Sequence, residues 1–150
     1  MKLFLLKRDI SQYTFPDILL GCFTSLGKAQ DARREYLTQY KLEKKIDPWK
    51  EQGYKTVVLE DDVEIIDDLP VFDFNDEDKS IYVVNVYAEF LAQVVRGFIA
   101  LCGTQKSAQI KLDTAKAESS DQFPEFFKIE KILLDILYPD DNLQEGYWWK

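Results

Sequence analysis

The sequence predicts an α+β protein made of two tandem strand–strand–helix–strand (ββαβ) units, with mainly antiparallel sheet and helices on one face. Three observations support this prediction. Segments of the first half match segments of the second half, the matching apolar runs have the length of strands, and hydroxyl residues that favour helix starts follow them. With 150 residues, 46% of them hydrophobic, the chain can fill one ordinary core or two small ones.

The two matching halves are offset by 79 residues. This offset stays constant from the first strand to the start of the helix, so the alignment needs no gap over that stretch. KLFLLKRD at residues 2–9 aligns with IYVVNVYA at 81–88, and ILLGCFTSLGKAQ at 18–30 aligns with GFIALCGTQKSAQ at 97–109. Each copy therefore reads as a strand, a loop, a second strand with a cysteine near its end, and a helix.

Hydroxyl side chains predict where the two helices begin. Thr24, Ser25 and Thr104 are of the type that caps the first free amides of a helix. Residues at spacings of three and four form one apolar stripe in each helix. These residues are Ala29, Ala32, Tyr36 and Tyr40 in the first helix, and Ala108, Leu112 and Ala115 in the second.

A third strand is expected after each helix, at residues 54–59 and 127–132, where the offset falls to 73 and the match depends on a gap. Residues 89–101 allow a second interpretation, because their apolar side chains also fall on one helical face. Clustered β-branched residues and Gly97 favour a strand at 94–101. A helix there would contradict the internal match.

We expect a first unit at residues 1–69, an acidic connector at 70–79 and a second unit at 80–150 with an aromatic C-terminal tail. The strand pairs, the Lys-Ala helix opening, and the last strand FKIEKILLD followed by LQEGYW resemble a small uncharacterised bacterial and phage family with a ββαβ core. The resemblance implies this fold and a tandem arrangement, and it transfers no site residue.

Composition excludes several reaction classes. The chain has no histidine, so Ser-His-Asp, Cys-His and His-containing zinc sites are excluded. Cys22 and Cys102 form no CxxC pair, and the six glycines form no phosphate-binding loop. The N-terminus lacks the pattern of a signal peptide, and no apolar run is long enough to span a membrane. We expect a cytoplasmic protein with no catalytic residue, no cofactor and no metal.

The strongest charge feature lies at residues 60–78, which hold ten carboxylates and no lysine or arginine. Outside this acidic run, 17 acidic side chains face 19 basic ones, although the net charge of the whole chain is −8. This run fits either a solvated connector or an ordered acidic ridge. The apolar residues that recur within it favour an ordered structure. Hard cations need only oxygen ligands, so an irregular magnesium or calcium site among Asp61, Asp62, Asp67 and Asp68 stays open.

These observations favour a non-enzymatic protein that binds a basic surface of a partner protein, as small inhibitors and immunity proteins do. Direct binding of nucleic acid is disfavoured because the basic residues are dispersed, and no membrane contact is expected. The C-terminal aromatic residues fit either a packed terminal staple or an interface anchor. The expected partner-binding residues are Asp61, Asp62, Glu64, Asp67, Asp68, Asp76, Glu77, Asp78, Trp148 and Trp149.

A second hypothesis is a small-ligand or divalent-cation-binding module that uses the crevice between the two units. A third, less favoured, is a metal enzyme that depends on carboxylates. The sequence alone leaves the oligomeric state and the identity of the partner open.

Overall fold

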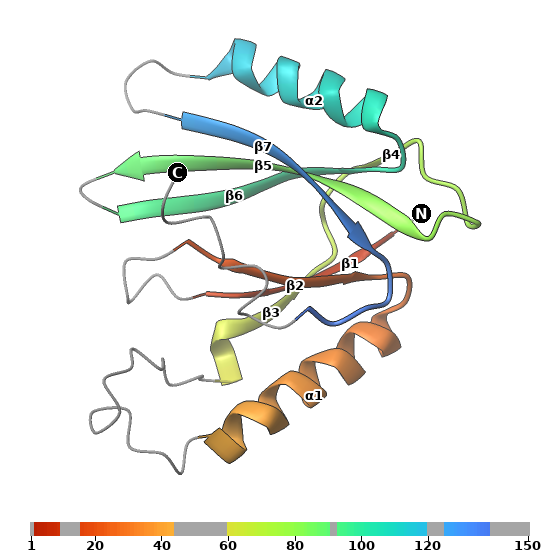
Figure 1. Cartoon of the computed structure of the whole chain (residues 1–150), viewed down its shortest axis with the longest axis vertical. Coiled ribbons are helices and arrows are strands. Elements are labelled where there is room, and N and C mark those ends of the chain that lie inside the picture. Colours follow the sequence, from red (N-terminus) through yellow and green to blue (C-terminus); the bar gives the residue numbers. More distant parts are fainter. Residues whose placement is uncertain (1, 10–15, 44–59, 91–92, 120–124, 139–150) are drawn as a thin grey trace.

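Two sheets lie face to face, and one helix covers the outer face of each (Figure 1). The computed structural model describes residues 2–9, 16–43, 60–90, 93–119 and 125–138. The layers follow the order helix, sheet, sheet, helix, and all but one of the strand pairs described are antiparallel. The α+β class predicted from the sequence is confirmed, and the strands form two separate sheets.

The first half forms a three-stranded sheet in the order β2-β1-β3. Its elements are β1 (Phe4–Arg8), β2 (Ile18–Phe23), α1 (Leu26–Glu43), a 3-10 turn η2 (Glu60–Asp62) and β3 (Val63–Ile66). The predicted cap is present, because the Ser25 hydroxyl accepts a hydrogen bond from the Lys28 amide at 3.2 Å. The predicted stripe is buried at Ala29, Ala32 and Tyr36; the side chain of Tyr40 lies outside the described residues.

The second half forms a four-stranded sheet in the order β4-β6-β5-β7. Its elements are β4 (Val71–Phe72), β5 (Ser80–Phe90), β6 (Gln93–Cys102), α2 (Gln105–Glu118) and β7 (Glu125–Leu133). The strand predicted at 94–101 is confirmed by β6, and Thr104 caps α2 by accepting a bond from the Ser107 amide at 3.1 Å. No described helix is long and apolar enough to cross a membrane.

Strand order and register are the same in the two halves. Each first strand pairs with the second and third strands, and each first pairing contains one register shift. The pairs before the shift are Leu6–Gly21 and Val84–Ala100, and the pairs after it are Lys7–Leu19 and Asn85–Phe98. β2 and β6 thus correspond at the predicted offset of 79, but β1 and β5 correspond at 78. A slip of one residue moves every side chain to the other face, so the ungapped alignment placed β1 wrongly.

The third strand of the first half also differs from expectation. The predicted segment, residues 54–59, lies outside the described residues. The strand that pairs with β1 is β3, which lies within the acidic run. Ile65 pairs with Leu6 as Ile129 pairs with Val84. The two halves therefore share their connectivity; their origin by duplication stays a prediction.

Three apolar clusters separate the four layers. Between the sheets lie Leu3, Leu5, Leu19, Cys22, Ile81, Val83, Leu101, Ile132 and Leu134. Between α1 and its sheet lie Leu6, Ile18, Leu20, Phe23, Ala29, Ala32, Tyr36, Leu37 and Val63. Between α2 and its sheet lie Val84, Ala100, Cys102, Ala108 and Leu112. Successive side chains of a strand point to opposite faces of its sheet, so neighbouring residues of one strand pack into two different clusters.

The two halves exchange segments. After β3 the chain crosses to the other sheet, where β4 covers the outer edge of β6. After β7 it returns, and residues 134–138 cover the outer edge of β2. The bonds are Leu101 N–H to Pro70 O (3.0 Å), Gly103 N–H to Phe72 O (2.8 Å), Asp135 N–H to Cys22 O (2.9 Å) and Tyr138 N–H to Leu20 O (2.8 Å). Each half therefore protects an edge strand of the other.

Candidate functional site

The acidic run at residues 60–78 is ordered and passes along the edges of both sheets. It comprises η2, β3, β4 and a turn in which Asn75 N–H donates to the Asp78 carboxylate at 2.9 Å. All ten of its acidic residues are exposed or half-buried. The run is therefore an ordered ridge, as the apolar residues in its sequence indicated.

The apolar residues of the acidic run point inward and reach all three clusters. Val63 and Ile65 join the cluster under α1, and Phe72 joins the one under α2. The residues that join the cluster between the sheets are Ile66, Leu69, Val71 and Phe74. The alternation of apolar and acidic residues therefore fixes the backbone of the run and leaves its carboxylates facing solvent.

Few cations offset these carboxylates within the described part of the chain. Lys2 pairs with Asp67 at 3.8 Å and Lys7 with Glu64 at 4.0 Å, and both carboxylates are about half exposed. Arg33 on α1 instead donates to the backbone, at Val63 O (2.8 Å) and Glu60 O (2.7 Å). Exposed ion pairs contribute at most about 1 kcal/mol, so the run keeps most of its negative field.

The predicted partner-binding residues form two groups. Asp61, Asp62, Glu64, Asp67 and Asp68 lie beside the first sheet, around β3. Asp76, Glu77 and Asp78 lie in the turn that leads into β5. Trp148 and Trp149 lie outside the described residues.

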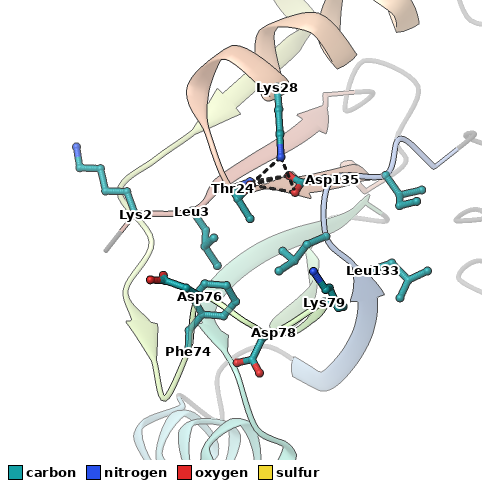
Figure 2. Close-up of a pocket in the computed structure, with 12 residues that line it drawn as sticks. Lys2, Leu3, Thr24, Lys28, Phe74, Asp76, Asp78, Lys79, Leu133 and Asp135 are labelled. Carbon is teal, nitrogen blue, oxygen red and sulfur yellow. Dashed lines mark hydrogen bonds and ion pairs between the residues drawn. The ribbon is translucent and has the colours of Figure 1, made fainter.

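Where the two halves meet, the second acidic group borders a groove of about 480 Å³. Figure 2 shows Thr24, Lys28 and Asp135 on one wall, and Phe74, Asp76 and Asp78 on the opposite wall. Lys2 and Lys79 also line it, so both signs of charge are present. This groove is the crevice that the second hypothesis requires.

Asp135 joins the returning segment to the start of α1. Its carboxylate accepts bonds from the Thr24 amide (2.8 Å) and hydroxyl (2.9 Å), and it pairs with Lys28 at 3.2 Å. Partial burial raises the pKa of Asp135, but the bonds from Thr24 and Lys28 outweigh it and lower the pKa below 3.8. Its φ of 61° is unusual outside glycine, and the same bonds hold it there.

Sequence reasoning identified Thr24 only as a helix cap and gave Asp135 no role. The two residues are 111 positions apart, and no local pattern joins them. Among the described residues, no three acidic or cysteine side chains lie close enough together to hold a metal ion. The groove can therefore offer a ligand separate positive and negative groups on an irregular wall.

A second polar cluster, also missed, lies between the sheets. The Lys7 ammonium contacts the Asp17 carboxylate at 2.5 Å, and Arg96 donates to Asn85 (2.9 Å), Glu130 (3.0 Å) and the Asp17 backbone oxygen (3.2 Å). Burial raises the pKa of Asp17, and the bond from Lys7 opposes this. Within the cluster these groups bond one another, which favours a structural role.

The two cysteines are unsuited to nucleophilic chemistry. Both are free and buried. Desolvation, with a smaller contribution from the Asp135 charge, raises the pKa of the Cys22 thiol to about 12. Desolvation also raises the pKa of Cys102. At neutral pH both are protonated, and the thiolate is the reactive form.

Comparison with known proteins gives no relative: no family model matches the sequence, and no curated protein or solved structure matches it.

Proposed function

We propose that this chain is a non-enzymatic protein-binding protein whose acidic run occupies a basic surface of a partner protein, in the manner of an inhibitor or immunity protein. One observation carries the proposal. The run displays ten acidic residues at the surface. Its apolar residues pack into the three clusters and hold its backbone in place. A fixed display binds with a smaller entropy cost than a disordered tail of equal charge.

Electrostatics favours the same role. Carboxylates that repel one another in the free protein gain further cations in a complex, so the run weakens the free fold slightly and attracts a basic partner at long range. Such steering raises association rates and is screened by salt.

A structural role for the charges competes with this proposal. β3 and β4 lie at sheet edges, and charged side chains at edges prevent pairing with other chains. Edge protection needs no partner. The two roles differ in what happens to association with a basic protein when the charges are removed.

The experiment neutralises four acids of the run, with Asp61→Asn, Asp62→Asn, Asp67→Asn and Asp68→Asn in one variant. Proteins bound by the wild type and lost by the variant are captured from lysate, and the purified partner is then measured at two ionic strengths. We expect the association rate to fall about tenfold or more and to lose most of its salt dependence. The fold should stay intact or melt slightly higher.

A matched control removes four exposed charges elsewhere, with Glu35→Gln, Glu89→Gln, Asp113→Asn and Glu118→Gln. It removes the same number of negative charges and should keep most of the association rate. Equal rates for the wild type and the acidic-run variant at both ionic strengths would assign the charges to edge protection alone.

The groove of Figure 2 supports a second candidate function, a small-ligand or cation-binding module. Its size is within the range of ligand sites, about 300 to 1,000 Å³, and it lies between the halves. A divalent cation that binds only the folded state would raise the melting temperature. If the first proposal is correct, a chelator or added calcium or magnesium should leave the melting temperature unchanged within about 2 °C.

A further inference from the structure

The groove where the two halves meet has an apolar lining that the protein leaves partly uncovered. Leu3 and Leu134 belong to the buried cluster between the sheets, and Phe74 packs against that cluster. Leu133 and Ile136 also line the groove, and they are 51% and 44% exposed. Large apolar side chains left exposed along a concave surface are typical of a site that binds an apolar group.

Several charged side chains of the groove already have partners within the chain. The Lys28 ammonium pairs with the Asp135 carboxylate at 3.2 Å. The Asp78 carboxylate accepts a hydrogen bond from Asn75 N–H at 2.9 Å. Lys2 pairs at 3.8 Å with a carboxylate that does not line the groove. These bonds explain their presence without a ligand.

Lys79 and Asp76 differ from these residues. Both are exposed, and among the described residues neither the Lys79 ammonium nor the Asp76 carboxylate has a hydrogen-bond or ion-pair partner. Their backbones are nevertheless held in place. The Lys79 carbonyl accepts a bond from Leu134 N–H at 2.9 Å, and Asp76 lies in a turn closed by the bond from Asp78 N–H to Asn75 O, also at 2.9 Å.

The two unpaired charges lie apart along the groove. Figure 2 shows the Asp76 carboxylate and the Lys79 nitrogen on either side of the Phe74 ring. The two residues are three positions apart in the sequence, so their Cα atoms lie within about 11 Å of each other. In the described part of the chain, the groove thus offers a ligand one positive group, one negative group and apolar surface near both.

We propose that the groove binds a short apolar peptide of two or three residues with both ends free, an inference that rests on the second candidate function. The peptide carboxylate pairs with Lys79, its ammonium pairs with Asp76, and its side chains cover Leu133 and Ile136. An extended peptide of this length spans about 7 to 11 Å, which matches the separation available. The volume of about 480 Å³ is sufficient for it.

Other small ligands satisfy the groove less well. An apolar carboxylate would leave Asp76 without a partner, and an apolar amine would do the same to Lys79. A single amino acid carries both charges on one carbon atom, so it would reach only one of the two groups. A peptide with free ends pairs both charges and also supplies apolar side chains.

Isothermal titration calorimetry of the purified full chain tests the proposal with leucyl-leucine as the probe. We expect leucyl-leucine to bind, and its C-terminal amide and its N-acetyl form each to bind about threefold or more weakly, because each loses one charge pair. Glycylglycine has the same charges without apolar side chains and should also bind more weakly. Absence of leucyl-leucine binding at millimolar concentrations would overturn the proposal.

Two variants assign the ends of the peptide. In Lys79→Met, amidation of the carboxylate should no longer weaken binding; in Asp76→Asn, acetylation of the ammonium should no longer do so. Lys106→Met and Asp113→Asn on α2 are the matched controls and should keep both differences. Circular dichroism checks that each variant is folded. Blocked peptides that lose the same affinity in every folded variant would contradict the proposed pairing.

The titration contains no partner protein, so its result does not depend on the role proposed for the acidic run. If leucyl-leucine does not bind but calcium or magnesium raises the melting temperature, only the peptide inference is overturned, and a cation-binding module remains. If neither effect is seen, the peptide inference and the cation-binding function are both overturned.

Discussion

The two halves of the molecule share strand order and register, but they fill equivalent positions with different chemistry. Lys7 and Asn85 follow the register shift in their first strands, and Asp17, just before β2, is equivalent to Arg96 within β6. In the first half, the Lys7 ammonium bonds the Asp17 carboxylate. In the second half, the Arg96 guanidinium bonds the Asn85 amide. The fold thus requires hydrogen-bonding partners at this end of the space between the sheets, and the residue types are free to differ.

The third strands differ in a second way. β3 is short and lies within the acidic run, whereas β7 is long and carries alternating lysine and glutamate. The Glu64 carboxylate of β3 is about half exposed, whereas the Glu130 carboxylate of β7 is only 10% exposed and accepts hydrogen bonds from Arg96 and Tyr87. The third strand therefore carries an exposed acid in one half and a nearly buried, hydrogen-bonded acid in the other.

The largest expected effect tests the polar cluster. In Arg96→Met the Glu130 carboxylate loses its guanidinium partner, although its side chain is only 10% exposed. Removing one member of a buried ion pair costs about 4 kcal/mol in the free energy of unfolding, measured by urea denaturation. Adding Glu130→Gln removes the buried charge and should recover part of the loss.

The exposed pair Arg34–Asp31 supplies the control, because both side chains are 75% exposed. Arg34→Met should cost less than about 1 kcal/mol. If Arg96→Met cost no more than Arg34→Met, the cluster would contribute little and the comparison of the two halves would lose its energetic basis.

The next effect tests the exchanged segments at the two glycines they approach. A Cβ at Gly103 would lie 2.0 Å from Asp73 O, and one at Gly21 would lie 2.6 Å from Ile136 O. Both neighbours are backbone, so the covering segment must move. Gly103→Ala should lower the free energy of unfolding by about 3 kcal/mol, and Gly21→Ala should lower it somewhat less.

Gly27 in α1 is the matched control, since its Cβ would meet nothing within 4 Å. Gly27→Ala should raise the free energy of unfolding by about 0.5 kcal/mol through helix propensity. Equal and small effects at all three glycines would show that the covering segments adjust without loss.

Local sequence signals predicted much of the fold and little of the site. Hydroxyl caps and apolar stripes located α1 and α2, an apolar run located β2, and clustered β-branched residues with Gly97 favoured β6, because these signals act within a few residues. The third strand of the first half was not recognised, since Glu64 and the flanking acids obscure an apolar pattern only four residues long. The shift of one residue between β1 and β5 was missed because Leu3, Leu5 and Leu6 look alike in either register.

The groove and the polar cluster had no local signal. Thr24 meets Asp135, and Asp17 meets Arg96, only because the halves face each other and exchange segments. Such contacts depend on the packing of two sheets, which periodicity within one strand does not encode.

The smallest expected effect tests the anchor that joins the returning segment to α1. Asp135→Asn keeps a residue type that tolerates a positive φ and removes the charge that accepts bonds from Thr24 and Lys28. This substitution should lower the free energy of unfolding by about 1 kcal/mol at pH 7, because a negative charge near a helix N-terminus stabilises a protein by about this amount. Asp113→Asn on the exposed face of α2 is the control and should change stability by less.

The pH dependence of the stability lost in Asp135→Asn shows whether Asp135 acts through its charge or through its packing. Because the pKa of Asp135 in the folded protein lies below its ordinary value of 3.8, the unfolded chain binds the proton first as pH falls. The stabilisation is therefore complete well above pH 3.8 and disappears as pH falls through the folded pKa. Thermal melts of the wild type and Asp135→Asn should differ at pH 7 and converge once the pH is below the folded pKa, which lies below 3.8. A difference that stays constant across this range would mean that Asp135 acts through shape alone, and that the anchor between the halves is not electrostatic.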